Sequence, residues 1–302
     1  MDILALIAAF GGGVLGAYMG ALPSFIMTGF FALVGGIGVA AGIPAAGFAV
    51  DMAFGSFLAP NIAFAGGVAA AAYARKKGVM ENGADITTAL YGLGEPDVLL
   101  VGGCTGIIGF IIASLISMTP LGPMTDVPGL CVVILGICTR LIFGETGLTG
   151  KYTGTEKRQW FTGGKGFMNN LVWSLGLGLT VSFIAAVLSN SYTETWEALS
   201  GIYPVVCFGF SAITLIFTQT GSAVPGSHHI TLPAATAAVV GITAFGPYGA
   251  FLGVVFAVIG AMLGNWAECT LNSYCDSHID PPGFTIFILI IIISILRGVL
   301  VG

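Results

Sequence analysis

Ten long apolar segments, separated by short polar stretches, make up most of the chain. They cover residues 3–21, 23–43, 50–74, 97–118, 127–144, 167–190, 203–219, 222–243, 247–267 and 282–301. A helix needs about 20 mostly apolar residues to cross a membrane. The pattern predicts an all-α integral membrane protein of about ten transmembrane helices, with a polar, glycine-rich connector at 145–166 between two sets of five.

Short motifs recur in the same order in the two sets. The matching groups are Gly20 and Pro23 with Gly201 and Pro204, then Gly55, Ser56 and Pro60 with Gly221, Ser222 and Pro225, and finally Asp126, Pro128 and Gly129 with Asp280, Pro282 and Gly283. The order indicates a duplication, with membrane repeat 1 at 1–144 and membrane repeat 2 at 167–302. Because each repeat has an odd number of spans, the second is expected to be inverted, as in transporters that bind solute between their halves.

Proline interrupts the third span of each repeat. Pro60 lies in the middle of 50–74, whereas Pro225 and Pro233 lie within 222–243. Proline lacks a backbone N–H and clashes with the preceding turn, so we expect broken helices at these positions. The freed backbone groups must face protein or a water-filled cavity. The two breaks therefore mark the predicted solute site.

The candidates for substrate binding or pore lining are the polar side chains beside the breaks. They are Asp51, Asn61, Ser227, His228, His229 and Thr231. A carboxylate within a span is costly unless it is paired or hydrated, although Asp51 would be an interfacial N-cap if its span began later. The two histidines suit protonation near neutral pH or metal binding, or else simple packing. On a regular helix they point about 100° apart, so an irregular backbone is needed for both to face one pore.

Asp126 and Asp280 each lie two residues before a proline, at the start of a span. Aspartate is a favourable helix N-cap and proline suits the first turn, so structural capping is one interpretation. The other is a carboxylate near a pore mouth.

The stretch 265–280 holds the densest set of possible metal ligands. Its candidates are Glu268, Cys269, Cys275 and His278. The Cys-x5-Cys-x2-His spacing is wider than that of usual zinc sites. A polar loop with incidental cysteines is the competing interpretation.

Composition supports the membrane prediction. The chain is 56% hydrophobic and 8% charged, whereas soluble domains carry about 25% charged residues. The Gly-xxx-Gly spacings at 12–20 and 260–264 predict close helix packing within the chain, with a dimer seam as the alternative. The chain has no run of basic residues that would indicate nucleic-acid binding. It also has no nucleotide-binding fingerprint that would indicate a cofactor.

The basic residues predict the orientation. Seven of the nine follow the third or the fifth span: Arg75, Lys76, Lys77, Lys151, Lys157, Arg158 and Lys165. Positive charge favours the cytoplasmic side. We therefore expect both termini outside the cytoplasm, in a bacterial or archaeal cell membrane.

Two stretches resemble the urea transporter family. "IDPPGFTIFI" at 279–288 is similar to that family's Asp-Leu-Pro-x-Phe-Thr stretch, and "SHHITLPAATAAVVGI" at 227–242 is similar to its His-Gly-Tyr-Asn-Gly-x-Leu-Val-Gly element. The Gly-Tyr-Asn-Gly core is missing here. The resemblance implies two inverted five-span halves around a pore, a homo-oligomer with one pore per subunit, and His228 at the place of the family's histidine.

These observations predict a channel or secondary transporter that moves a small polar solute between two inverted repeats in the lipid bilayer, without a cofactor. One alternative is a cation-coupled or divalent metal-ion transporter. Another is an intramembrane enzyme that uses a pair such as Asp51 and His228.

Overall fold

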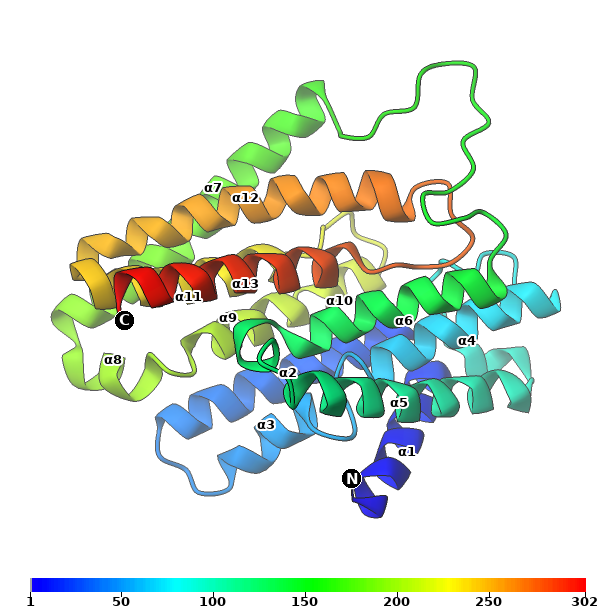
Figure 1. Cartoon of the computed structure of the whole chain (residues 1–302), viewed down its shortest axis with the longest axis horizontal. Helices are drawn as coiled ribbons and strands as arrows, with labels where there is room; N and C mark the ends of the chain where they lie inside the picture. Colours follow the sequence, from blue (N-terminus) through cyan, green and yellow to red (C-terminus); the bar gives the residue numbers. More distant parts are fainter. Residues whose placement is uncertain (1) are drawn as a thin grey trace.

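The computed structural model describes residues 2–302, and this range contains helices but no β-strand. The helices are α1 (Ile3–Met19), α2 (Ala21–Ala40), α3 (Ala46–Phe54), α4 (Ala63–Lys77), α5 (Pro96–Ser117), α6 (Val127–Phe143), α7 (Gly164–Ser191), α8 (Thr193–Leu199), α9 (Tyr203–Ile213), α10 (Leu215–Gln219), α11 (His228–Phe245), α12 (Phe251–Ala267) and α13 (Pro281–Leu300). Most of them lie along the long axis of the molecule, while α1 and α7 cross it at a steep angle (Figure 1).

Six helical segments are long and apolar enough to cross a membrane. They are Ala21–Ala40, Pro96–Ser117, Gly164–Ser191, His228–Phe245, Pro247–Asn272 and Pro281–Leu300. A seventh results if α8 and the helical stretch Tyr203–Gln219, bent by 76°, form one span. The apolar helices α1 and α6 are shorter, at 17 residues each. The prediction of a helical membrane protein therefore holds, whereas helix length alone does not yield ten spans.

The same pattern of helix contacts occurs twice. The helices α1, α4 and α5 pack against one another, and so do α7, α11 and α12. The helix α6 packs on α4 and α5, as α13 packs on α11 and α12. The two groups contact each other through α6 and α13. In addition, α2 contacts α9. Figure 1 shows that α6 and α13 run in opposite directions, as do α5 and α12.

Glycine allows the helices of the first group to approach closely. A methyl group at Gly16 would overlap the carbonyl oxygen of Ala63, and one at Gly13 would overlap that of Gly102. The backbones of α1, α4 and α5 therefore touch directly, as small residues permit in membrane helices. The prediction of close packing within the chain is confirmed.

The first predicted helix break is confirmed. The helix α3 ends at Phe54 and α4 begins at Ala63, with Pro60 in the irregular segment between them. The hydroxyl of Thr28 on α2 donates a hydrogen bond of 2.7 Å to the carbonyl oxygen of Leu58. This bond satisfies one of the backbone groups that the break frees.

The second break lies only partly where it was predicted. The segment after Gln219 is not helical and contains Pro225, but α11 begins at His228 and continues through Pro233. The prediction that Pro233 interrupts the span is wrong. Pro233 lies in the second turn of α11, where the loss of one N–H leaves the rest of the helix hydrogen-bonded.

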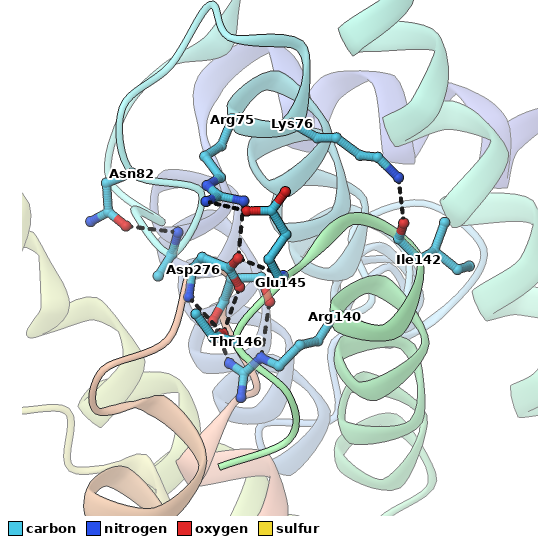
Figure 2. A network of polar contacts seen from close by, with 10 residues as sticks. Arg75, Lys76, Asn82, Arg140, Ile142, Glu145, Thr146 and Asp276 are labelled. Carbon is cyan, nitrogen blue, oxygen red and sulfur yellow. Dashed lines mark hydrogen bonds and ion pairs between the residues drawn. The ribbon is translucent and has the colours of Figure 1, made fainter. Parts of the chain in front are cut away.

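The predicted connector begins in a polar network that also includes the end of α4 and the segment before α13 (Figure 2). The guanidinium of Arg75 lies 2.9 Å from the Asp276 carboxylate and 3.2 Å from that of Glu145. The Thr146 hydroxyl and the Glu145 N–H each donate a 2.7 Å hydrogen bond to Asp276. Buried Arg140 donates to Ser277 and to the carbonyl oxygens of 148 and 271. At its other end the connector is shorter than predicted, because α7 begins at Gly164.

This network sets the charge state of Asp276. Burial by itself raises the pKa of a carboxyl group. For Asp276 the hydrogen bonds from Thr146 and from the Glu145 N–H, together with the charge of Arg75, outweigh burial and hold the pKa below its ordinary value of 3.8. Asp276 therefore stays ionised throughout the neutral range.

Candidate functional site

A cavity of about 600 Å³ lies beside the first helix break. Its wall is mostly apolar and includes five phenylalanines, namely Phe25, Phe54, Phe64, Phe110 and Phe208. The polar side chains on it include Asn61, Asp126, His228 and Asp280. The lining residues come from α2, α3, α4, α5, α6, α9, α11 and α13 and from the irregular segment before α4. We call this space the first cavity.

The two aspartates of the first cavity are helix caps. Oδ1 of Asp126 accepts a hydrogen bond of 2.6 Å from the Gly129 N–H, in the first turn of α6. Oδ2 of Asp280 accepts one of 2.7 Å from the Gly283 N–H, in the first turn of α13. The capping interpretation is confirmed, and both carboxylates also line the cavity.

The starts of α6 and α13 lie against each other. A methyl group built on Gly129 would lie 3.1 Å from the carbonyl oxygen of Gly283, and one on Gly283 would lie 3.2 Å from that of Gly129. Glycine at both positions lets the two backbones meet. The two capping aspartates are thereby held on one cavity wall.

A second cavity, of about 480 Å³, lies beside the second break. It is lined by residues before α11, by α7 and α12, and by Ile86 and Thr87 of the loop between α4 and α5. The side-chain amide of Gln219 donates a hydrogen bond of 3.0 Å to the carbonyl oxygen of Thr87. The Leu22 N–H donates one of 2.7 Å to the carbonyl oxygen of Ile86. Nothing in the sequence placed this loop at the site, because the loop carries no motif and its contacts join distant parts of the chain.

The two cavities share one wall. Four residues line both of them: Phe25, Phe64, His228 and Asp280. The ring of Phe25 lies 4.7 Å from that of His228 and 5.6 Å from that of Phe64, centroid to centroid. We call these four residues the septum. The septum consists mainly of packed rings and separates the two spaces.

His228 is buried in the septum without a hydrogen-bond partner. Its exposed fraction is 5%. Its Nδ1 is enclosed and makes no hydrogen bond within residues 2–302. His229 lines only the second cavity, and its ring is 6.1 Å from that of His228 at an interplanar angle of 88°. The regular start of α11 therefore turns the two rings apart, as helix geometry predicts.

The other predicted site residues are placed differently. Asn61 lines the first cavity and donates a hydrogen bond of 3.0 Å to the carbonyl oxygen of Gly109. The Thr231 hydroxyl lies 2.7 Å from that of Ser211, and neither Thr231 nor buried Ser227 lines a cavity. Asp51 is exposed on α3 and also lines neither cavity. The catalytic pair of Asp51 and His228 is therefore not formed around these cavities.

The metal-ligand candidates are engaged elsewhere. His278 contacts Asn272 through Nδ1 at 3.1 Å and Asp280 through Nε2 at 3.2 Å. Glu268 accepts a hydrogen bond of 3.3 Å from Asn272. The sulfur of Cys275 lies 3.4 Å from a backbone carbonyl oxygen, and that of Cys269 lies 3.7 Å from the Thr162 hydroxyl. Over residues 2–302 the structure places no three His, Cys, Asp or Glu residues where they could hold a metal ion.

The structure is all-helical over residues 2–302, and six of its helical segments are long and apolar enough to cross a membrane. The chain belongs to a family of unknown function, DUF7973, whose model matches residues 1–158 and 177–301. No curated protein and no solved structure matches the chain. The resemblance to urea transporters stays a prediction.

Proposed function

We propose that this protein is a channel or secondary transporter that moves a small polar solute between two inverted repeats. The observation that carries the proposal is the septum, because Phe25, Phe64, His228 and Asp280 form a wall that the two cavities share. A solute that passed this wall would move from one cavity to the other. Transporters commonly place the solute site at such a point, where broken helices meet.

The repeated contact pattern supports the inverted repeats. The group α1, α4, α5 and α6 corresponds to the group α7, α11, α12 and α13, and the equivalent helices α6 and α13 pack on each other in opposite directions. The mutual approach of Gly129 and Gly283 fits a twofold relation at this point. On this proposal ten membrane passages are completed when the six long segments are joined by the short helices α1 and α6, by the broken segment of α3 and α4, and by the bent stretch of α8 and Tyr203–Gln219.

The positions of the cavities support passage across the membrane. The first cavity reaches Ser117, the last residue of α5, whereas the second reaches Glu268, just after α12. Since α5 and α12 run in opposite directions (Figure 1), the two cavities extend toward opposite ends of the molecule. This is the arrangement expected of two vestibules with a barrier between them.

The two alternatives have less support. A divalent metal site needs several ligands around one point, and residues 2–302 offer no such group of three. An enzyme built on Asp51 would need that carboxylate within reach of the reacting atoms, but Asp51 is exposed outside both cavities. The homo-oligomer, the cytoplasmic side and the external termini remain predictions.

Solute flux into liposomes tests the proposal. The purified full-length protein is reconstituted, and uptake of a panel of small polar solutes is compared with that of protein-free liposomes. Ala113 lines the first cavity, so Ala113→Trp should fill the space and lower the flux. Ala45→Trp, at an exposed position on the N-terminal side of α3, is the matched control. The proposal fails if no solute enters faster than in empty liposomes, or if both variants behave alike.

A further inference from the structure

The first cavity contains an unpaired negative charge. Oδ1 of Asp126 caps α6, while its Oδ2 has no hydrogen-bond or ion-pair partner within residues 2–302. No lysine or arginine lines either cavity in this part of the chain. A carboxylate taken out of water is costly unless it is paired or hydrated, and the α6 dipole offsets only about half of the charge. Asp126 therefore lacks a full counter-charge from the protein.

Aromatic rings surround the same space. The ring of Phe208 lies 5.5 Å from that of Phe25 and 5.5 Å from that of Phe54, so these three rings form a packed row on the cavity wall. Ring faces attract cations, and aromatic walls are a common way to bind alkylated ammonium groups. A bare metal ion gains little from such a wall, whereas an organic cation has apolar surface to bury against it.

His228 is a second, independent indication of a ligand. Its imidazole is buried, lines both cavities and has an enclosed Nδ1 without a partner. Buried polar side chains normally have a hydrogen-bond partner, so an unpartnered one calls for an explanation. Its Nε2 is not enclosed and accepts no hydrogen bond from residues 2–302. This nitrogen is available to a donor group in the cavity.

We infer that the solute is a small organic molecule that carries an ammonium group. The carboxylate of Asp126 pairs with the positive charge, the phenylalanines enclose its methyl or methylene groups, and His228 contacts a polar N–H or O–H of the molecule. The cavity of about 600 Å³ is in the size range of small-molecule sites. This inference rests on the proposed function and names the class of its substrate.

Binding to the purified full-length protein in detergent tests the inference. Choline, ethanolamine and methylammonium are compared by calorimetry with 3,3-dimethylbutan-1-ol, which has the shape of choline but no charge. At least one ammonium compound should bind, and choline should bind roughly tenfold or more tightly than its neutral isostere. If no ammonium compound binds, or if the isostere binds equally well, the inference is wrong.

Two aspartate variants locate the site. Asp126→Asn removes the charge, but asparagine is also a good N-cap, so the fold is preserved. This variant should weaken binding of the ammonium compound roughly tenfold or more. Asp2 caps α1 outside both cavities, where its carboxylate accepts from the Leu4 N–H, so Asp2→Asn is the matched control. Equal affinity in the Asp126 variant and the wild type would remove Asp126 from the site.

The liposome assay separates this inference from the proposed function. Flux of neutral solutes, with no preference for ammonium compounds, would overturn the substrate class and leave the channel or transporter intact. Ammonium binding in detergent without flux across liposomes would overturn the channel or transporter and leave the binding of ammonium compounds intact. Flux of ammonium compounds that is lost in Asp126→Asn and kept in Asp2→Asn supports both.

Discussion

The guanidinium of Arg75, at the end of α4, lies 2.9 Å from the carboxylate of Asp276, which is 201 residues further along the chain and just before α13. The Asp276 side chain is only 9% exposed and also accepts from Thr146 and from the Glu145 N–H (Figure 2). The pair and its partners therefore join the end of α4, the start of the connector and the segment before α13.

Loss of the Asp276 carboxylate should weaken the fold. Asp276→Ala leaves the Thr146 hydroxyl, the Glu145 N–H and Arg75 without their shared acceptor, at a cost of about 2 kcal/mol. Asp97→Ala is the control, because that carboxylate pairs with Lys77 at a much more exposed position, where solvent screening makes the loss of a pair cost less. Thermal unfolding in detergent measures both, and equal shifts would contradict the expected difference.

The Asp276 carboxylate also predicts that the stability of the fold depends on pH. The pKa of Asp276 is lower in the folded chain than its ordinary value of 3.8, so its contribution to stability is complete above that value. The contribution disappears as the pH falls toward the lower, folded-state pKa. The melting temperature should therefore fall below about pH 4 more steeply in the wild type than in Asp276→Asn. Parallel curves for the two proteins would exclude this role.

Glycine packing on α1 gives a sharp contrast between neighbours. Gly16→Ala forces a methyl group into the carbonyl oxygen of Ala63, and it should destabilise the protein by about 1–3 kcal/mol. Gly11 lies on the same helix and nothing would lie within 4 Å of a methyl group there. Because alanine is the better helix former, Gly11→Ala should be neutral or stabilising. Unfolding midpoints of the two variants should move in opposite directions or differ clearly.

Capping and charge can be separated at Asp126. Asp126→Ala loses the bond to the Gly129 N–H and should lower stability by about 1 kcal/mol, whereas Asp126→Asn keeps a cap and should stay near the wild type. Both variants lose the charge, so both should lose binding of ammonium compounds. A binding loss confined to Asp126→Ala would trace the effect to the helix start instead of the charge.

The septum should act as a barrier. Phe25→Leu keeps an apolar side chain but removes the ring that packs on Phe64, Phe208 and His228. We expect solute flux into liposomes to rise several-fold. Phe48 is 68% exposed on α3, so Phe48→Leu should leave the flux unchanged. Unchanged flux in both variants would argue against a barrier at Phe25.

Local signals predicted much of the helical fold. Apolar length located the helices, and Pro60 located the first break because a proline in the middle of a span removes a hydrogen bond and adds a clash. The same reasoning failed at Pro233, because the chain begins α11 five residues earlier and tolerates a proline in its second turn. The capping roles of Asp126 and Asp280 were predicted from each aspartate and the proline two residues after it.

The site was only partly predictable, because it depends on tertiary contacts. Asn61, His228 and His229 line the cavities, but the side of α3 on which Asp51 lies could not be read from an apolar segment. Phe25 and Phe64 looked like ordinary apolar residues. Thr87 reached the second cavity through a loop whose position is fixed by contacts with Leu22 and Gln219.

The meeting of Gly129 and Gly283 restricts how sequences of this kind can diverge. Any side chain gained at one position presses on the backbone at the other, so neither helix start can change independently. The two positions are therefore expected to be inherited as a unit, although 154 residues separate them along the chain.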